Sequence, residues 1–172
     1  MSNPQKKLNP PPNQKALQQS KTTQTQSEVK TDMSPDQKMV QTIRQLSNGL
    51  RDYEIRQLVE QAEALGSYLV QQGLKTNQIR KFLDAVNRLK VELAQDKEEK
   101  FSTIKDEVFL LKPKLAYAAA RQQDRRGSPV KPLSDVISAA IDKVNDSPDF
   151  YRLVQLIESI IAYHKAAGGR DN

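Results

Sequence analysis

The chain has 172 residues, of which 37% are hydrophobic and 28% charged, with a net charge of +6 and no cysteine. The absence of cysteine excludes disulfides and thiol chemistry and agrees with a reducing, cytoplasmic location. No apolar run approaches the roughly 20 residues of a membrane helix, and the N-terminus lacks the apolar core of a signal peptide, so we expect no membrane partner.

Residues 1–33 are predicted to form a disordered, low-complexity tail. The segment is rich in Gln, Asn, Lys, Thr and Pro, including the run 10–12 of three prolines. It has too few apolar groups to offset the entropy lost on ordering. We expect it to solvate the chain or to hold RNA or a partner loosely. Residues 34–172 are long enough to bury a core and are predicted to form one helical domain.

Start and stop signals divide the first half of this domain into helices. Apolar residues recur there at spacings of three and four, as in Ile79, Phe82, Val86 and Leu89, which is the pattern of a half-buried helix. Capping residues, proline and glycine mark the ends. The predicted helices run from Ser34-Pro35 to Asn48-Gly49, from about Asp52 to Gly73, and from a Thr76 cap to the charged segment 96–100.

The second half follows the same rules. A helix is predicted from about Ser102, and another helical stretch reaches about Gln123; Pro113 either kinks one long helix or divides two. The remaining elements are a loop over residues 122–131, a helix from about Pro132 to Asn145, and a last helix capped at Ser147 that ends at Gly168-Gly169. No strand pattern occurs. We therefore predict an all-α fold, a compact bundle of five to seven helices.

Positive charge is concentrated between Lys112 and Lys131. This stretch holds six basic residues and one acid, Asp124. An alanine-rich helix that leads into a basic loop is suited to an anion, most plausibly a phosphate backbone, while chance clustering on a solvated loop is the open alternative.

Catalytic and metal-binding patterns are missing. His164 is the only histidine, so a histidine metal cluster or dyad cannot form, and we expect it to be a helix-terminal side chain or an RNA contact. The chain has no glycine-rich phosphate loop. Adjacent acids such as Asp106 and Glu107 point to different faces of a helix. We expect no enzyme activity, no cofactor and no metal site.

Three segments carry a resemblance. They are TNQIRKF at residues 76–82, LLKPKLAY at 110–117 with Arg121, and Phe150 followed by ESIIAYHK at 158–165. In this order and spacing, residues 50–168 resemble the small subunit of the type III-A CRISPR (Csm-type) effector complex. The resemblance implies a non-catalytic helical subunit, present in several copies, that flanks the guide RNA–target RNA duplex and contacts the backbone and large subunits of the complex.

The same resemblance implies RNA-contacting residues, namely Arg80, Lys81, Lys112, Lys114 and Arg121. The basic loop adds Arg125 and Arg126 as phosphate contacts. Such contacts would neutralise charge without reading bases, because phosphates carry no sequence information. Tyr117 and Tyr163 are expected in the core, with stacking on a base as the alternative.

Two other functions are open at this level. The chain could be a helical protein–protein scaffold, in which the alanine-rich helix is an interface and the basic loop meets an acidic partner. It could also be a basic DNA-binding regulator that presents Asn77, Gln78 and Arg80 to base edges.

Overall fold

The computed structural model describes residues 33–98, 100–123, 125 and 127–171. Every helix or strand assigned within these residues is a helix, which confirms the all-α prediction. The tail predicted over residues 1–33 lies, apart from Met33, outside the described residues. No helix in the described part of the chain is long and apolar enough to cross a membrane.

The helices have the following bounds: α1 Pro35–Gln45, α2 Ile55–Gln71, α3 Thr76–Gln95, α4 Lys105–Phe109, α5 Leu111–Arg121, α6 Lys131–Ile141 and α7 Ser147–Ala166, with 3₁₀ turns at Leu50–Asp52 and Phe101–Thr103.

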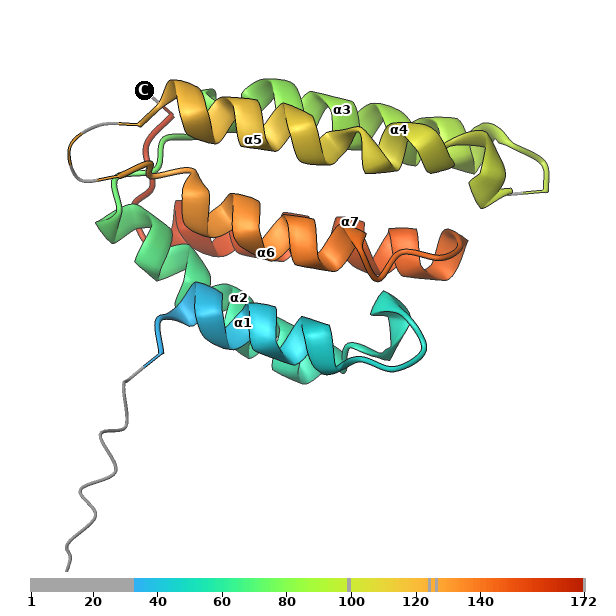
Figure 1. Cartoon of the computed structure of the whole chain (residues 1–172), viewed down its shortest axis with the longest axis horizontal. Helices are drawn as coiled ribbons and strands as arrows, with labels where there is room; N and C mark the ends of the chain where they lie inside the picture. Colours follow the sequence, from blue (N-terminus) through green and yellow to red (C-terminus); the bar gives the residue numbers. More distant parts are fainter. Residues whose placement is uncertain (1–32, 99, 124, 126, 172) are drawn as a thin grey trace, which may run out of the picture. The chain divides into compact units, whose positions relative to one another are not determined.

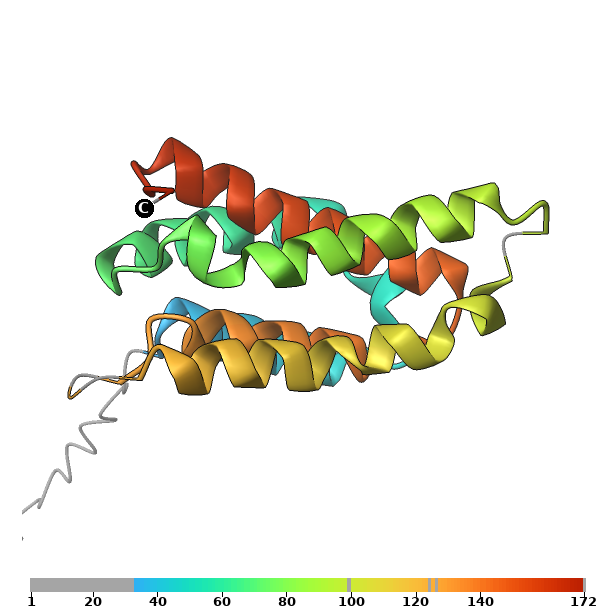
Figure 2. The same cartoon turned by 90° about the horizontal axis from the view of Figure 1, so that it is seen from above.

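The helices of residues 33–171 pack in two layers. One layer holds α1, α6 and α5 side by side, and the other holds α2, α7 and α3, as the two perpendicular views show (Figures 1 and 2). The core lies between the layers and includes Phe150 and Leu153 of α7, both fully buried. Because α6 and α7 are central, α3 and α5 form one edge of the bundle.

Helix starts depend on caps that the sequence only partly identifies. Ser34 precedes α1 as predicted, and its amide donates to Gln37 Oε1 at 3.2 Å. Thr76 is the first residue of α3 rather than its cap, because Lys75 holds the extended backbone that precedes the helix. Ser147 is likewise the first residue of α7; Asp146 is the cap and accepts a hydrogen bond from Asp149 N at 3.1 Å.

Several predicted boundaries move for local reasons. The second helix begins at Ile55 instead of near Asp52, and the helix predicted from about Ser102 begins at Lys105, because a 3₁₀ turn precedes each of them. Helix α6 ends at Ile141 rather than Asn145, because the following turn has 3₁₀-type hydrogen bonds between residues i and i+3. Lys143 N donates to Ala140 O, and Val144 N donates to Ile141 O.

The chain divides at Leu110, so Pro113 does not kink one long helix. Helix α4 ends at Phe109, and Pro113 is the third residue of α5. A proline there lacks the N–H that would bond the Phe109 carbonyl, and its ring crowds that oxygen. The first turn of a helix needs no such bond, which makes it a suitable place for proline.

Helices α2 and α7 pack at very close range through Gly66. A Cβ atom at this position would lie 2.7 Å from His164 N. His164 is fully buried, and its Nε2 lies 2.9 Å from the Leu74 carbonyl oxygen. His164 lies in the last turn of α7, which confirms the expected helix-terminal position, but its burial leaves no exposed ring for an RNA contact: the histidine joins the end of α7 to the turn before α3.

A buried carboxylate ties the first loop to α7. Asp149 accepts from Arg51 N at 2.8 Å, from Arg51 Nε at 3.2 Å and from Asn145 N at 2.9 Å. Gly49 passes over this carboxylate with φ +123°, where a Cβ atom would lie 2.5 Å from one of its oxygens. Only glycine suits both the conformation and the space.

Candidate nucleic-acid interface

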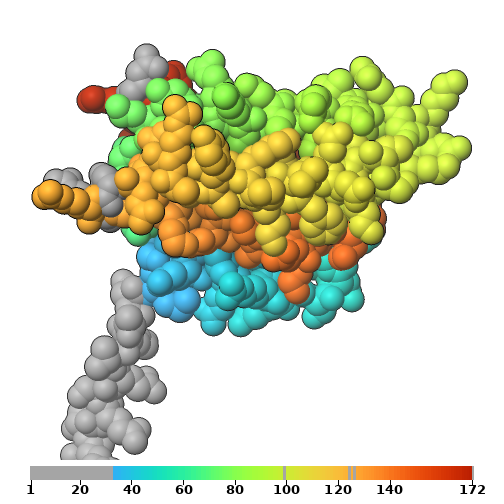
Figure 3. Space-filling view, turned by 45° about the horizontal axis from the view of Figure 1, so that its top comes forward, coloured from blue at the N-terminus to red at the C-terminus, as the bar shows by residue number. Residues whose placement is uncertain are grey.

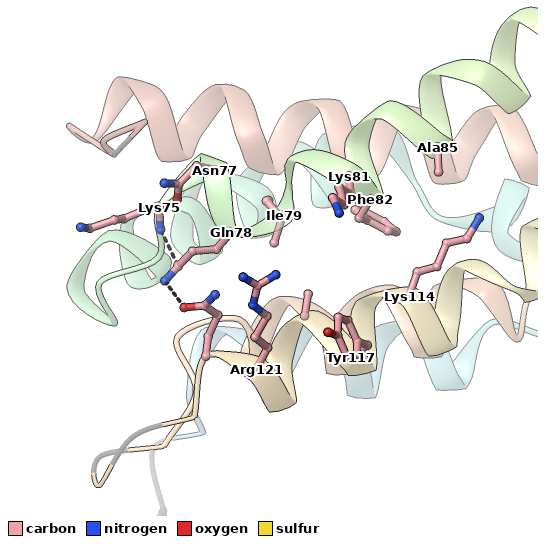
Figure 4. Close-up of a pocket in the computed structure, with 12 residues that line it drawn as sticks. Lys75, Asn77, Gln78, Ile79, Lys81, Phe82, Ala85, Lys114, Tyr117 and Arg121 are labelled. Carbon is pink, nitrogen blue, oxygen red and sulfur yellow. Dashed lines mark hydrogen bonds between the residues drawn. The ribbon is translucent and has the colours of Figure 1, made fainter.

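Helices α3 and α5 run antiparallel along one edge of the bundle, and the space-filling view shows their side chains as adjacent bands on one face (Figure 3). On α5, Lys114, Tyr117, Ala118 and Arg121 follow the spacing i, i+3, i+4, i+7 and therefore share one face. That face turns toward α3 (Figure 4).

A groove of about 660 Å³ lies between these two helices. We call it the α3–α5 groove, because the residues that line it come from α3, α5 and their immediate flanks. The lining residues are Lys75, Asn77, Gln78, Ile79, Lys81, Phe82, Ala85, Lys114, Tyr117, Ala118, Arg121 and Gln122.

The groove combines an apolar floor with cationic walls. Ile79 and Phe82 are buried at its base, whereas Lys81 and Lys114 are exposed at its sides. No acidic side chain lines it within the described part of the chain. Lys75, Lys81, Lys114 and Arg121 form no ion pair with another described residue. Within the described residues, these four positive charges are therefore unpaired.

One end of the groove is closed by amide hydrogen bonds. Gln78 Oε1 accepts from Lys75 N at 2.9 Å, and Gln78 Nε2 donates to Gln122 Oε1 at 3.2 Å, which links α3 to the end of α5 (Figure 4). A second hollow of about 560 Å³ continues past this link and shares Arg121 with the groove. The amide oxygen and the amide nitrogen of Gln78 are therefore each hydrogen-bonded within the chain.

The C-terminal segment occupies the start of α3. Thr76 N donates to Arg170 O at 3.0 Å, and Asn77 N donates to Asp171 O at 3.1 Å. A hydrogen bond from Lys165 holds the pKa of Asp171 below its ordinary value. Because these backbone donors of α3 are satisfied, the attraction of the groove for anions comes from side chains.

The predicted RNA-contacting residues divide into groups. Lys81, Lys114 and Arg121 meet in the groove. Lys112 points elsewhere and pairs with Asp142 at 2.6 Å, and exposed Arg80 lies outside the lining near Asp171. Arg125 is exposed in the loop between α5 and α6. Arg126 lies outside the described residues.

The structure adds Lys75, which the sequence prediction missed, to the binding surface and places Tyr117 outside the core. Lys75 directly precedes α3. Its helical spacing from Ile79 and Phe82 is the sequence signal that could have placed it on the same side of α3 as these two residues. Tyr117 is 68% exposed, so its expected place in the core is wrong: α5 packs inward through Leu111 and Leu115, and Tyr117 lies on the opposite side. Tyr163, by contrast, is half-buried against the core.

Comparison with known proteins places this geometry in a family. The model of the family described as Csm2 Type III-A matches residues 52–170, which include all of α3 and α5. The chain belongs to this family. A relative from Streptococcus thermophilus, named "CRISPR system Cms protein Csm2", is 32% identical over 108 residues, covering 62% of this chain and 79% of the relative. The groove thus lies within the part of the chain that matches the Csm2 family.

Metal chemistry finds no support in the arrangement of side chains. No group of three or more His, Asp or Glu residues in the described ranges could hold a metal ion. The side chains that the groove brings together are cations, amides and an aromatic ring. They can bind and orient an anion, and they include neither a carboxylate nor a histidine to move protons.

Proposed function

We propose that this small subunit of a type III-A CRISPR complex lines the guide RNA–target RNA duplex through sequence-independent phosphate contacts in the α3–α5 groove. The observation that carries the proposal is the convergence of four cationic side chains on one groove, whose described lining residues include no acid. The groove lies within the region matched by the family.

Of the RNA-contacting residues predicted from the sequence, Lys81, Lys114 and Arg121 are the proposed phosphate contacts in the groove. Lys75 is added to them. Each side chain carries several N–H donors and a full charge, and contact with a phosphate releases condensed counterions. Arg125 and Arg126 of the loop extend the basic surface in this proposal. Lys112 and Arg80 contribute at longer range, since the former is already paired and the latter lies outside the groove.

Recognition of base edges is not part of the proposal. Of the three residues considered for base edges at the start of α3, Gln78 already bonds within the chain through its oxygen and its nitrogen, whereas Asn77 and Arg80 are exposed. The family match is what supports RNA lining over a DNA-binding regulator. We further propose a non-catalytic role, with the backbone and large subunits and further copies of the chain as protein partners.

The test is affinity purification of the tagged full chain from its own cells, followed by RNA sequencing and identification of proteins. Short RNAs with a uniform 5′ repeat sequence and several protein subunits are expected. A purified set of proteins whose composition survives ribonuclease and holds no RNA would instead favour the scaffold function. Preference for duplex DNA over RNA would favour the regulator.

A further inference from the structure

Tyr117 is a feature that phosphate binding alone does not use. We infer that the α3–α5 groove holds one unpaired nucleotide that has left the stack of the RNA it lines, with its base against Tyr117 and its phosphates on Lys81, Lys114 and Arg121. The inference rests on the proposed function and adds that the groove takes an unpaired nucleotide, for which single-stranded RNA is the simplest probe. It makes Tyr117 a binding residue rather than a residue of the core.

The exposure of Tyr117 is the first observation. The ring is 68% exposed and, among the described residues, makes no hydrogen bond or ring contact. It lies on the face of α5 that also carries Lys114 and Arg121, one turn to either side. A large aromatic side chain left open between two cations is the combination found in proteins that bind single-stranded nucleic acid.

The shape of the groove is the second observation. Phe82 supplies an apolar surface on the α3 side, and Ala85 and Ala118 are small enough to leave space above it. The volume of about 660 Å³ lies within the range of roughly 300–1,000 Å³ typical of small-ligand pockets. A nucleotide matches this lining, because its base has apolar faces and its phosphates are anionic.

A base in a duplex cannot make this contact. In an A-form helix the bases are stacked and paired, so a protein meets phosphates and 2′-hydroxyls along the outside. Contact between a base face and Tyr117 requires a nucleotide that has left the stack. Stacking on aromatic rings tolerates every base, which keeps the recognition independent of sequence.

The experiment compares Tyr117→Ala and Tyr117→Phe with the wild-type full chain. Fluorescence anisotropy gives the affinity of each protein for a labelled single-stranded RNA and for the same RNA in a perfect duplex, at fixed salt. Tyr117→Ala is expected to weaken single-strand binding about 5- to 150-fold, the range that corresponds to the loss of one stacked base. Tyr117→Phe keeps the ring and should bind like wild type, and duplex affinity should be equal in all three proteins.

A second variant, Lys114→Gln combined with Arg121→Gln, separates this inference from the proposed function. If it weakens RNA binding while Tyr117→Ala does not, the stacking inference is wrong and phosphate lining stands. If neither variant alters binding, or the wild type does not bind RNA, both are wrong. Equal loss of single-strand and duplex binding in Tyr117→Ala also overturns the inference. Far-UV circular dichroism verifies that each variant folds.

Discussion

Gly66→Ala tests whether α2 and α7 approach as closely as described. Alanine is favoured over glycine within a helix by about 1 kcal/mol, so helix propensity alone predicts a more stable protein. The new Cβ atom, however, would lie 2.7 Å from His164 N and 2.8 Å from the Tyr163 carbonyl carbon. Backbone atoms of a packed helix cannot rotate away as a side-chain tip can, so α7 must shift.

Overpacking of this kind typically costs about 1–3 kcal/mol, and occasionally more. Contact with two backbone atoms favours the upper part of that range, about 2–3 kcal/mol. Less the propensity gain of about 1 kcal/mol, the expected net loss is about 1–2 kcal/mol, or about 3–8 °C in Tm for a domain of this size. Urea and thermal unfolding followed by far-UV circular dichroism give both values.

Ala64→Gly is the matched control, because Ala64 is exposed on the same helix. It should lose about 1 kcal/mol, which measures helix propensity without packing. A Gly66→Ala protein that is as stable as wild type, or more so, while Ala64→Gly shows its loss, would refute the close packing of α2 on α7.

Two further substitutions probe hydrogen-bonded carboxylates. Asp149→Asn should lower the free energy of unfolding by about 1–3 kcal/mol in urea denaturation, because an NH₂ group replaces one of the oxygens that accept from Arg51 and Asn145; unchanged stability would contradict this. Hydrogen bonds from the backbone amides of Arg56 and Gln57 hold the pKa of Glu54 below its ordinary 4.5. Because the pKa of Glu54 is lowered in the folded state, its carboxylate contributes stability that is fully present above pH 4.5. That contribution is lost as the pH falls through the lowered pKa. Glu54→Gln should therefore be less stable than wild type at pH 7, with a difference that narrows below pH 4.5; a constant difference would be inconsistent with the cap.

Helix identity was predictable because it depends on local rules. Apolar spacing located the buried faces, and Gly73, with φ +79°, ends the second helix where a left-handed residue was expected. Caps were harder to assign, since Asp146 and Ser147 are both suitable and adjacent. Tertiary packing decided between them, because the carboxylate of Asp146 also meets Arg51.

Only part of the site was predictable, because the positions of basic residues along the sequence do not show which of them meet in the folded chain. Lys112 and Lys114 are two residues apart, yet Lys112 pairs with Asp142, directly after α6, and Lys114 lines the groove. Lys75 and Lys81 join Lys114 only because α3 and α5 pack antiparallel, which spacing within either helix does not reveal. Tyr117 is exposed because α5 lies at the edge of the bundle, where its face toward the α3–α5 groove is left open by the described residues.

The most direct test of the central claim, that the α3–α5 groove binds RNA through its cations, is the salt dependence of single-stranded RNA affinity for two charge-matched triple variants. One carries Lys81→Gln, Lys114→Gln and Arg121→Gln in the groove. The other carries Lys90→Gln, Lys97→Gln and Lys105→Gln outside it. We predict that the groove variant binds more weakly and that its slope of log K against log salt is shallower by about 2, at roughly 0.7 per lost phosphate contact. The outer variant should stay close to wild type. Equal losses in the two variants would contradict the claim, because net charge and not the groove would then determine RNA binding.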